Sequence, residues 1–285
     1  MDIQFDTLDI RPGTALAAAY GNGEKRVYFQ EQSGWVREAT YDSTHRWRNG
    51  IKVVQPKSGS PIAVAYEGLN KFAYNGKEWS EGSLGKFHFE VSPSTNLAAR
   101  YVDGEPCVYA QVVDTSIYEY KHANDKWQIT FKFGTGLNNT SIAAPATGRQ
   151  QIFYQSTESV IIEKILVDGI WKDGLYKYRN DEADTPIVAC TFGDDNHRVY
   201  HLDSLHRIVE SMWNTKDGVW THHILEKDAN PDSKLAVFAF TDGKNPAIVD
   251  IPLYLQDEQG GKSISEYAFD FGSGWTANSS ILPVK

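Results

Sequence analysis

The sequence predicts an all-β fold, a six-bladed β-propeller, from two repeating features. A run of small apolar residues recurs six times, and a tryptophan follows each run. Successive tryptophans lie about 44 to 55 residues apart, with one shorter interval before Trp79. The runs begin at Leu16, Ile62, Leu97, Ile142, Ile187 and Leu235, and the tryptophans are Trp47, Trp79, Trp127, Trp171, Trp220 and Trp275. Each copy has room for three or four short strands, and we expect all copies to form one domain over residues 1–285.

The first copy shows the pattern of a single blade. Residues 26–30 alternate polar and apolar side chains, and residues 36–41 have the same character after a short turn at Ser33 and Gly34. This alternation predicts two half-buried strands joined as a hairpin. A hairpin brings the start of one strand beside the end of the other, so we expect Arg26 and Glu38 to meet with Trp47 nearby.

The second and last copies depart from the pattern. Only a few residues separate the run at Ile62 from the next apolar stretch, Leu69 to Tyr74, so we expect a shortened second blade. The last copy has an insertion at residues 241–250, expected to be a loop, and the chain stops about ten residues after Trp275. Because an open sheet edge invites aggregation, we expect residues 3–8 to supply the outer strand of the last blade and close the ring.

Charge and hydropathy exclude several partners. The formal net charge of −9 argues against nucleic acid, which needs a basic face. No apolar run approaches the roughly 20 residues that span a bilayer, so we expect no membrane insertion. The acidic start of the chain does not resemble a signal peptide, and we expect a protein that is cytoplasmic or released without a signal peptide.

The remaining reactive residues predict no cofactor and no metal. Cys107 and Cys190 lie in different copies and are interpreted as free buried thiols in preference to a disulfide. His197, His201 and His206 have no cysteine or carboxylate partner at a spacing typical of metal sites. We interpret them as packed or solvated side chains.

Taken together, the Ala-rich run, the Arg-Val-Tyr-Phe-Gln strand, the Arg-Glu-Ala strand and the late tryptophan resemble the fungal fucose-binding lectins of the Aleuria type. The resemblance extends from about Leu16 to Trp275 and is most specific between Arg26 and Ala39. In that family the sugar sites lie between adjacent blades. One blade gives an arginine and a glutamate, and the next gives its late tryptophan and an aromatic residue three positions after its own glutamate position. The resemblance implies a lectin that is not an enzyme and that binds L-fucose and fucosylated glycans.

Carried over position by position, the family pattern implies two complete sites and several degraded ones. The complete sets are Arg26 and Glu38 with Tyr74 and Trp79, and Arg198 and Glu210 with Phe269 and Trp275. The sets expected to bind weakly, or to bind another sugar, are Gln151 and Glu163 with Trp213 and Trp220, Glu119 with Trp171, and Glu266 with Tyr41 and Trp47. In these three sets Gln151, Cys107 and Pro252 replace the arginine, and Leu166 replaces an aromatic residue beside Trp171. Lys71 replaces the glutamate of the second copy, so we expect no binding there.

The residue types suit the chemistry of a deoxy sugar. An arginine fork donates several hydrogen bonds in fixed geometry, and a carboxylate accepts from hydroxyl groups. Aromatic rings cover the apolar face of the ring, as they do in most small-molecule sites.

Three other interpretations remain open from the sequence. The tryptophans can be packing residues, and each arginine and glutamate a cross-strand ion pair, in a degenerate lectin with another sugar preference or a sugar-blind scaffold. Sialidase-type glycosidases are also six-bladed propellers, but a glycosidase needs one pair of carboxylates at one centre. A glutamate repeated in five copies favours repeated binding sites instead. Association into a homodimer is a further open alternative.

Overall fold

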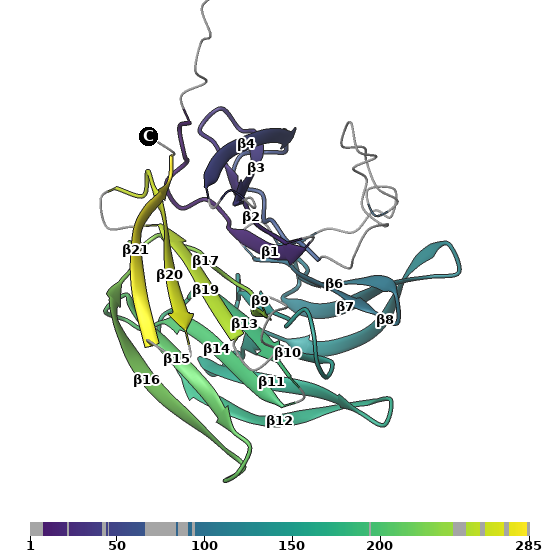
Figure 1. The fold of residues 1–285 in the computed structure, drawn as a ribbon. Helices are drawn as coiled ribbons and strands as arrows, with labels where there is room; N and C mark the ends of the chain where they lie inside the picture. Colours follow the sequence, from purple (N-terminus) through teal and green to yellow (C-terminus); the bar gives the residue numbers. More distant parts are fainter. Residues whose placement is uncertain are drawn as a thin grey trace, which may run out of the picture.

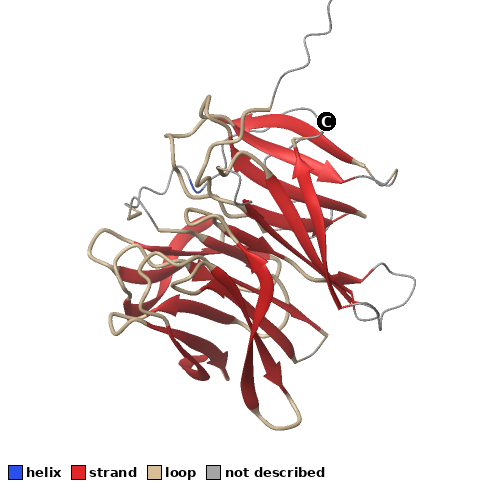
Figure 2. Cartoon of the chain, turned by 90° about the vertical axis from the view of Figure 1, so that its left-hand side faces the viewer, coloured by secondary structure: helices blue, strands red, loops and turns tan. Residues whose placement is uncertain are grey.

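A computed structural model describes residues 8–21, 23–41, 44, 46–65, 84, 91–92, 95–193, 195–241, 249–256, 260–270 and 274–283. Within these ranges the regular structure is almost entirely β-strand, arranged as separate antiparallel sheets (Figure 2). Figure 1 shows the sheets following one another in chain order, with the first sheet next to the last. The all-β prediction is confirmed.

Each sheet runs through its strands in sequence order, as expected for a propeller blade. The first sheet contains β1 (Ala17–Gly21), β2 (Glu24–Gln30), β3 (Val36–Tyr41) and β4 (Trp47–Val54). The sheet of the third copy contains β5 (Ala98–Val102), β6 (Glu105–Gln111), β7 (Ser116–Ala123) and β8 (Lys126–Thr135). The fourth contains β9 (Ile142–Ala143), β10 (Gln151–Gln155), β11 (Val160–Val167) and β12 (Ile170–Arg179). The fifth contains β13 (Ile187–Phe192), β14 (Asn196–Leu202), β15 (Arg207–Asn214) and β16 (Val219–Asp228). The last contains β17 (Leu235–Val237), β18 (Phe240–Thr241), β19 (Val249–Gln256), β20 (Ile264–Asp270) and β21 (Gly274–Leu282).

The six small-apolar runs meet around one central channel. The channel is lined by residues 16–18, 62–64, 97–99, 142–144, 187–189 and 235–237, three from each copy. Small side chains are needed there because the innermost strands converge on the axis. The run of the second copy therefore holds the same place as the other five. The rest of that copy, and with it the predicted loss of a strand, lies largely outside the described residues.

The hydrophobic core lies between neighbouring sheets. One cluster joins the fifth and last sheets through Tyr200 and Ile251, and another joins the last and first sheets through Tyr254 and Phe29. Further clusters join the third sheet to the fourth and the fourth to the fifth. Side chains from two blades therefore meet at each of these four interfaces.

The closure of the ring differs from the prediction. The outer strand of the last sheet is β21, so the C-terminal copy fills the place expected for residues 3–8. Residues 3–7 lie outside the described part, and Ile10 pairs with Glu31 of the first sheet. The side-chain amide of Gln256 in β19 donates a hydrogen bond to the Arg11 carbonyl at 2.9 Å. The segment around Ile10 and Arg11 thus ties the last sheet to the first without serving as an outer strand there.

Two other predictions concern the whole chain. Cys107 and Cys190 are buried free thiols, as predicted. A search of the described residues finds no helix long and apolar enough to span a membrane. The extent of the single domain over residues 1–285 stays a prediction, because residues 1–7 and 284–285 lie outside the described part.

Candidate functional sites between the blades

The repeated glutamate occupies the same register position in every described sheet. It lies directly opposite the tyrosine or phenylalanine that follows the arginine position by two residues. The pairs are Glu38 with Tyr28, Glu119 with Tyr109, Glu163 with Phe153, Glu210 with Tyr200 and Glu266 with Tyr254. Three of these tyrosines, Tyr28, Tyr200 and Tyr254, donate their hydroxyl to the opposite carboxylate at 2.6 to 3.0 Å. Each carboxylate is therefore fixed in place and almost completely buried.

The late tryptophan also has a constant partner. It lies opposite the residue three positions after the glutamate, as the family pattern requires. These pairs are Tyr41 with Trp47, His122 with Trp127, Leu166 with Trp171, Trp213 with Trp220 and Phe269 with Trp275. The two side chains share one face of the sheet, because opposite residues of an antiparallel pair point the same way.

The outer strands make room for the carboxylates. A register shift next to the glutamate interrupts the ladder in the first, third, fourth and last sheets. In the fourth sheet the Tyr176 backbone N–H donates to Glu163 at 3.2 Å, and a Cβ on Gly174 would lie 2.2 Å from the same Glu163 oxygen. The register shift, and the fact that glycine has no side chain, together leave room for the buried carboxylate of Glu163. Sequence periodicity alone could not reveal this accommodation, because it depends on an irregular ladder.

The interface between the fifth and last sheets brings together all four of its predicted residues. The Trp275 indole N–H donates to Glu210 Oε2 at 3.4 Å across the interface, and Phe269 packs on Trp275 with ring centroids 5.4 Å apart. Arg198 forms an ion pair with Glu210, with Nε 3.8 Å from Oε1, a distance too long for a hydrogen bond. Burial raises the pKa of Tyr200 well above its usual value, so its hydroxyl stays a donor to Glu210.

Arg198 is the unsatisfied group of this interface. Its guanidinium has no hydrogen-bond partner among the described residues, although its side chain is only 14% exposed and Nε is buried. The guanidinium also lies over the Phe192 ring, with Cζ 5.8 Å from the centroid. A buried polar group without a partner is costly. Arg198 therefore presents donors to the space between the blades for a ligand that supplies acceptors.

The first predicted site is only half described. Arg26 and Glu38 lie on one sheet, and the Glu38 carboxylate accepts from the Tyr28 hydroxyl at 2.6 Å. The Arg26 guanidinium forms an ion pair with Glu24 at 2.8 Å, and the negative charge of Glu38 acts on it as well. Their predicted partners Tyr74 and Trp79 lie outside the described residues, as does Lys71 of the next set.

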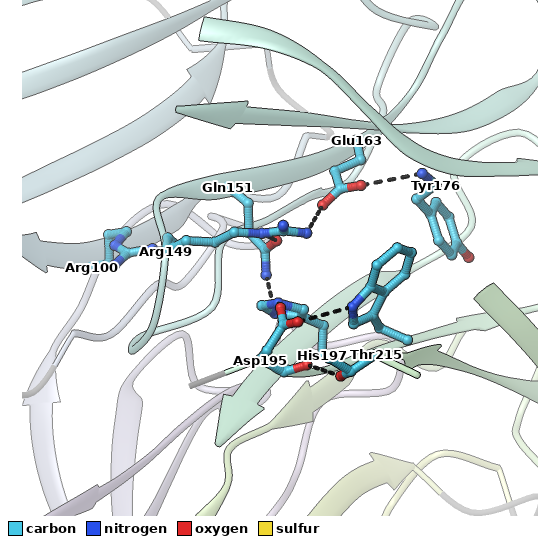
Figure 3. Close-up of polar contacts among 9 residues, drawn as sticks. Arg100, Arg149, Gln151, Glu163, Tyr176, Asp195, His197 and Thr215 are labelled. Atoms are coloured by element: carbon cyan, nitrogen blue, oxygen red, sulfur yellow. Dashed lines mark hydrogen bonds and ion pairs between the residues drawn. The ribbon is translucent and has the colours of Figure 1, made fainter. Parts of the chain in front are cut away.

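The interface between the fourth and fifth sheets contains an arginine that the sequence analysis missed. Arg149, just before β10, donates from Nη2 to Glu163 at 2.9 Å and from Nε to the Gln151 side-chain oxygen at 2.9 Å (Figure 3). Gln151 is completely buried, and its amide donates to His197 Nδ1 of the fifth sheet at 2.9 Å. Gln151 therefore holds Arg149 and His197 in place, and its predicted part in binding a sugar stays a prediction. Arg149 supplies the guanidinium here.

The fifth sheet contributes an extra acid to this interface. His197 Nε2 lies 3.0 Å from Asp195 Oδ1, and the Trp213 indole N–H donates to Asp195 Oδ2 at 3.3 Å. Burial, and then the charge of Arg149, lower the pKa of His197, so the ring is neutral and its Nδ1 can accept from Gln151. The predicted aromatic pair, Trp213 and Trp220, has ring centroids 5.7 Å apart and lies beside the contacts of Asp195 and His197.

Lys25 occupies the interface between the last and first sheets. From β2 it donates to both oxygens of Glu266 at 3.1 and 3.2 Å, and its ammonium lies 5.3 Å from the centroid of the Tyr41 ring. Trp47 packs edge-on against Tyr254 at 5.9 Å. The predicted set of Glu266, Tyr41 and Trp47 is thus assembled, but a lysine of this chain fills it.

The interface between the third and fourth sheets is filled in a similar way. Gln150 donates to Glu119 Oε2 at 3.2 Å, and the Thr130 hydroxyl donates to the other oxygen at 2.6 Å. Trp171 packs on Phe133 with centroids 4.7 Å apart and belongs to the core here. Burial raises the pKa of Cys107, which stands at the arginine position, to about 12, so it offers no charge.

Lys25, Gln150 and His197 share one sequence position, directly before the arginine position of their own blade. Neighbouring residues of a strand point to opposite faces. The arginine position therefore faces the following blade, and the residue before it faces the preceding blade. At the interface of the fifth and last sheets this residue is Ile251, a buried apolar side chain that brings no charge or amide to Arg198 and Glu210. Arg149 lies in the loop two residues before Gln151, outside β10, so strand alternation gave no signal for it.

These features define the class of the protein. It is a β-propeller with a buried carboxylate and an indole at each of the four described interfaces between blades, and with a guanidinium beside them at two, a set that suits a small polar ligand with an apolar face.

The family follows from comparison with known proteins. A family model described as fungal fucose-specific lectin matches residues 10–285, and the chain belongs to that family of non-enzymatic carbohydrate-binding proteins. The fucose-specific lectin of Aleuria aurantia is 28% identical over 291 residues, which cover 91% of each chain. A solved Aleuria aurantia lectin mutant in complex with Fucα1-6GlcNAc has a TM-score of 0.79 at 25% identity, covering 96% of this chain and 97% of that one. A further Aleuria aurantia lectin structure, described as a six-bladed β-propeller, has a TM-score of 0.79 at 24% identity, with the same coverage. The predicted family and six-bladed fold are confirmed.

Proposed function

We propose that this lectin binds L-fucose and fucosylated glycans between its blades, with the site of Arg198, Glu210, Phe269 and Trp275 as the complete described example. The buried Nε of Arg198, which has no hydrogen-bond partner among the described residues, carries the proposal. Arg198 offers donors beside a fixed carboxylate acceptor, and Trp275 and Phe269 supply an apolar wall. The Aleuria aurantia lectin that resembles this chain holds Fucα1-6GlcNAc.

The site of Arg26 and Glu38 is proposed as the second one, with Tyr74 and Trp79 from the shortened copy. Each site is expected to bind a monosaccharide weakly. A small ligand with a few charged hydrogen bonds and one stacked face gains about 4 to 8 kcal/mol, a dissociation constant between roughly millimolar and micromolar. Two such sites on one molecule can hold a densely fucosylated surface far more tightly, since the second contact is intramolecular.

A glycan array with the intact protein tests the function. Retention of fucosylated glycans, lost in a variant carrying Arg26→Ala and Arg198→Ala, supports the proposal. Arg179→Ala is the matched control, because this arginine is 69% exposed and far less constrained. Retention of other sugars only would favour a lectin of another preference, and no retention at all would favour a sugar-blind scaffold. Association into a homodimer is an alternative that analytical ultracentrifugation tests, and the location, cytoplasmic or released without a signal peptide, stays a prediction.

A further inference from the structure

The loop before β10 holds Arg149 in a fixed place. The Arg100 guanidinium donates to the backbone carbonyls of Arg149 at 3.1 Å and Gly148 at 3.0 Å. On the other side, the Thr147 hydroxyl donates to the Thr191 carbonyl at 3.0 Å. The loop is thus clamped between the third and fifth sheets. The backbone of Arg149 is therefore held by hydrogen bonding, although Arg149 lies in a loop and not in a strand.

The chain of contacts in Figure 3 leaves two charged groups with capacity for a ligand. Arg149 uses Nε and Nη2, but Nη1 has no partner among the described residues, and the side chain is 34% exposed. The Asp195 carboxylate accepts one hydrogen bond on each oxygen, yet a carboxylate has about four acceptor positions. Its side chain is 42% exposed. A donor group and an acceptor group therefore remain available beside Trp213.

Asp195 lies at the edge of the aromatic wall. The hydrogen bond from the Trp213 indole N–H holds the Asp195 carboxylate at this edge. A sugar ring stacked on Trp213 and Trp220 would therefore bring one of its substituents next to the carboxylate. Although desolvation opposes ionisation, the hydrogen bonds from His197 and Trp213 lower the pKa of Asp195, and it stays charged. A methyl group there would cover the carboxylate without a hydrogen bond, which is unfavourable. A hydroxymethyl group would donate one.

We propose that the interface of the fourth and fifth sheets is a further sugar site of altered preference. In it Arg149 supplies the guanidinium, and Asp195 adds an acceptor that favours a hexose with a hydroxymethyl group over a 6-deoxy hexose. This inference rests on the proposed function, because it assumes that the interfaces between blades bind sugars. It deepens that function by assigning one interface a second class of ligand. Gln151 and His197 are positioning residues within it.

The test isolates this interface and uses two probes that differ by one hydroxyl group. A variant with Arg26→Ala and Arg198→Ala removes the two arginines of the predicted fucose sites. Methyl α-L-galactoside and methyl α-L-fucoside are then titrated by calorimetry, since L-galactose is L-fucose with a 6-hydroxyl group. We expect one binding event, with the galactoside about tenfold tighter, as one hydrogen bond to a charged group allows. Arg149→Ala added to this variant should abolish binding, whereas Arg179→Ala should leave it unchanged.

Asp195→Asn tests the specificity separately from folding. It keeps the size of the side chain and one acceptor oxygen, and it should reduce the preference for the galactoside to about twofold or less. Equal affinity for the two probes before this substitution would overturn the altered preference. Absence of binding to the isolated interface, while the parent protein binds fucoside, would overturn the site itself. Absence of fucoside binding by the parent protein would instead overturn the proposed function.

Discussion

Replacing Lys25 by methionine should destabilise the fold, because the interface of the last and first sheets then keeps a buried carboxylate without its cation. Glu266 has a side-chain exposure of 5% and Lys25 one of 17%. Removing one partner of a fully buried pair costs about 3 to 5 kcal/mol, whereas exposed pairs contribute about 0 to 1 kcal/mol. Water reaches Lys25, and the Tyr254 hydroxyl still donates to Glu266 at 2.8 Å. We therefore expect a loss of about 1 to 3 kcal/mol in the free energy of unfolding.

A double-mutant cycle measures the interaction itself. Urea unfolding of Lys25→Met, Glu266→Gln and the double variant gives the coupling energy, expected at about 1 to 2 kcal/mol. Lys121→Met is the matched control, because its partner Asp103 is 88% exposed, and it should cost less than about 0.5 kcal/mol. A coupling energy below about 0.3 kcal/mol would refute the reasoning, since Lys25 would then not neutralise Glu266.

Three further outcomes follow from single positions. Gly174→Ala should displace the carboxylate of Glu163, because the new Cβ would collide with it. The free energy of unfolding, measured by denaturant titration, should fall by about 1 to 3 kcal/mol. An unchanged free energy of unfolding would contradict the close contact. Burial lowers the pKa of His201 to about 4, so the unfolded state binds more protons below pH 6.5. Stability should fall by up to about 3 kcal/mol between pH 6.5 and 4, and a slope that survives His201→Gln would exclude this histidine as its source. Trp79→Ala should weaken fucoside binding at Arg26 without unfolding the protein; lost thermal stability with normal binding would identify a packing residue.

Period-two alternation predicted the local arrangement within each blade. It predicted the hairpin of β2 and β3, which puts Arg26 and Glu38 on one face of the first sheet. Trp47, which we expected beside them, packs instead on Tyr254 of the preceding blade. The set of four residues around Arg198 was implied by the family resemblance, and the structure brings the four together at one interface. Alternation indicates which face of the sheet a side chain is on, but it does not show whether that side chain is long enough to reach a glutamate of the neighbouring blade.

Two of the residues that the sequence analysis missed make contacts across two blades. Lys25 and Gln150 reach glutamates of the preceding blade, and their contacts depend on the distance between sheets, which no local pattern encodes. Arg149 lies in a loop whose position is set by Arg100 and by the clamp on the fifth sheet. Residues 3–8 are expected as the outer strand of the last blade because only about ten residues follow Trp275. β21 begins at Gly274, just before this tryptophan, so those residues are enough to complete the sheet.

The crystal structure of the protein with methyl α-L-fucoside tests the central claim most directly. We expect the sugar between the fifth and last sheets, with hydroxyl groups within hydrogen-bond distance of Arg198 and Glu210 and its apolar face on Trp275. A sugar bound only elsewhere, or an interface that stays unoccupied at saturating fucoside, would contradict this assignment.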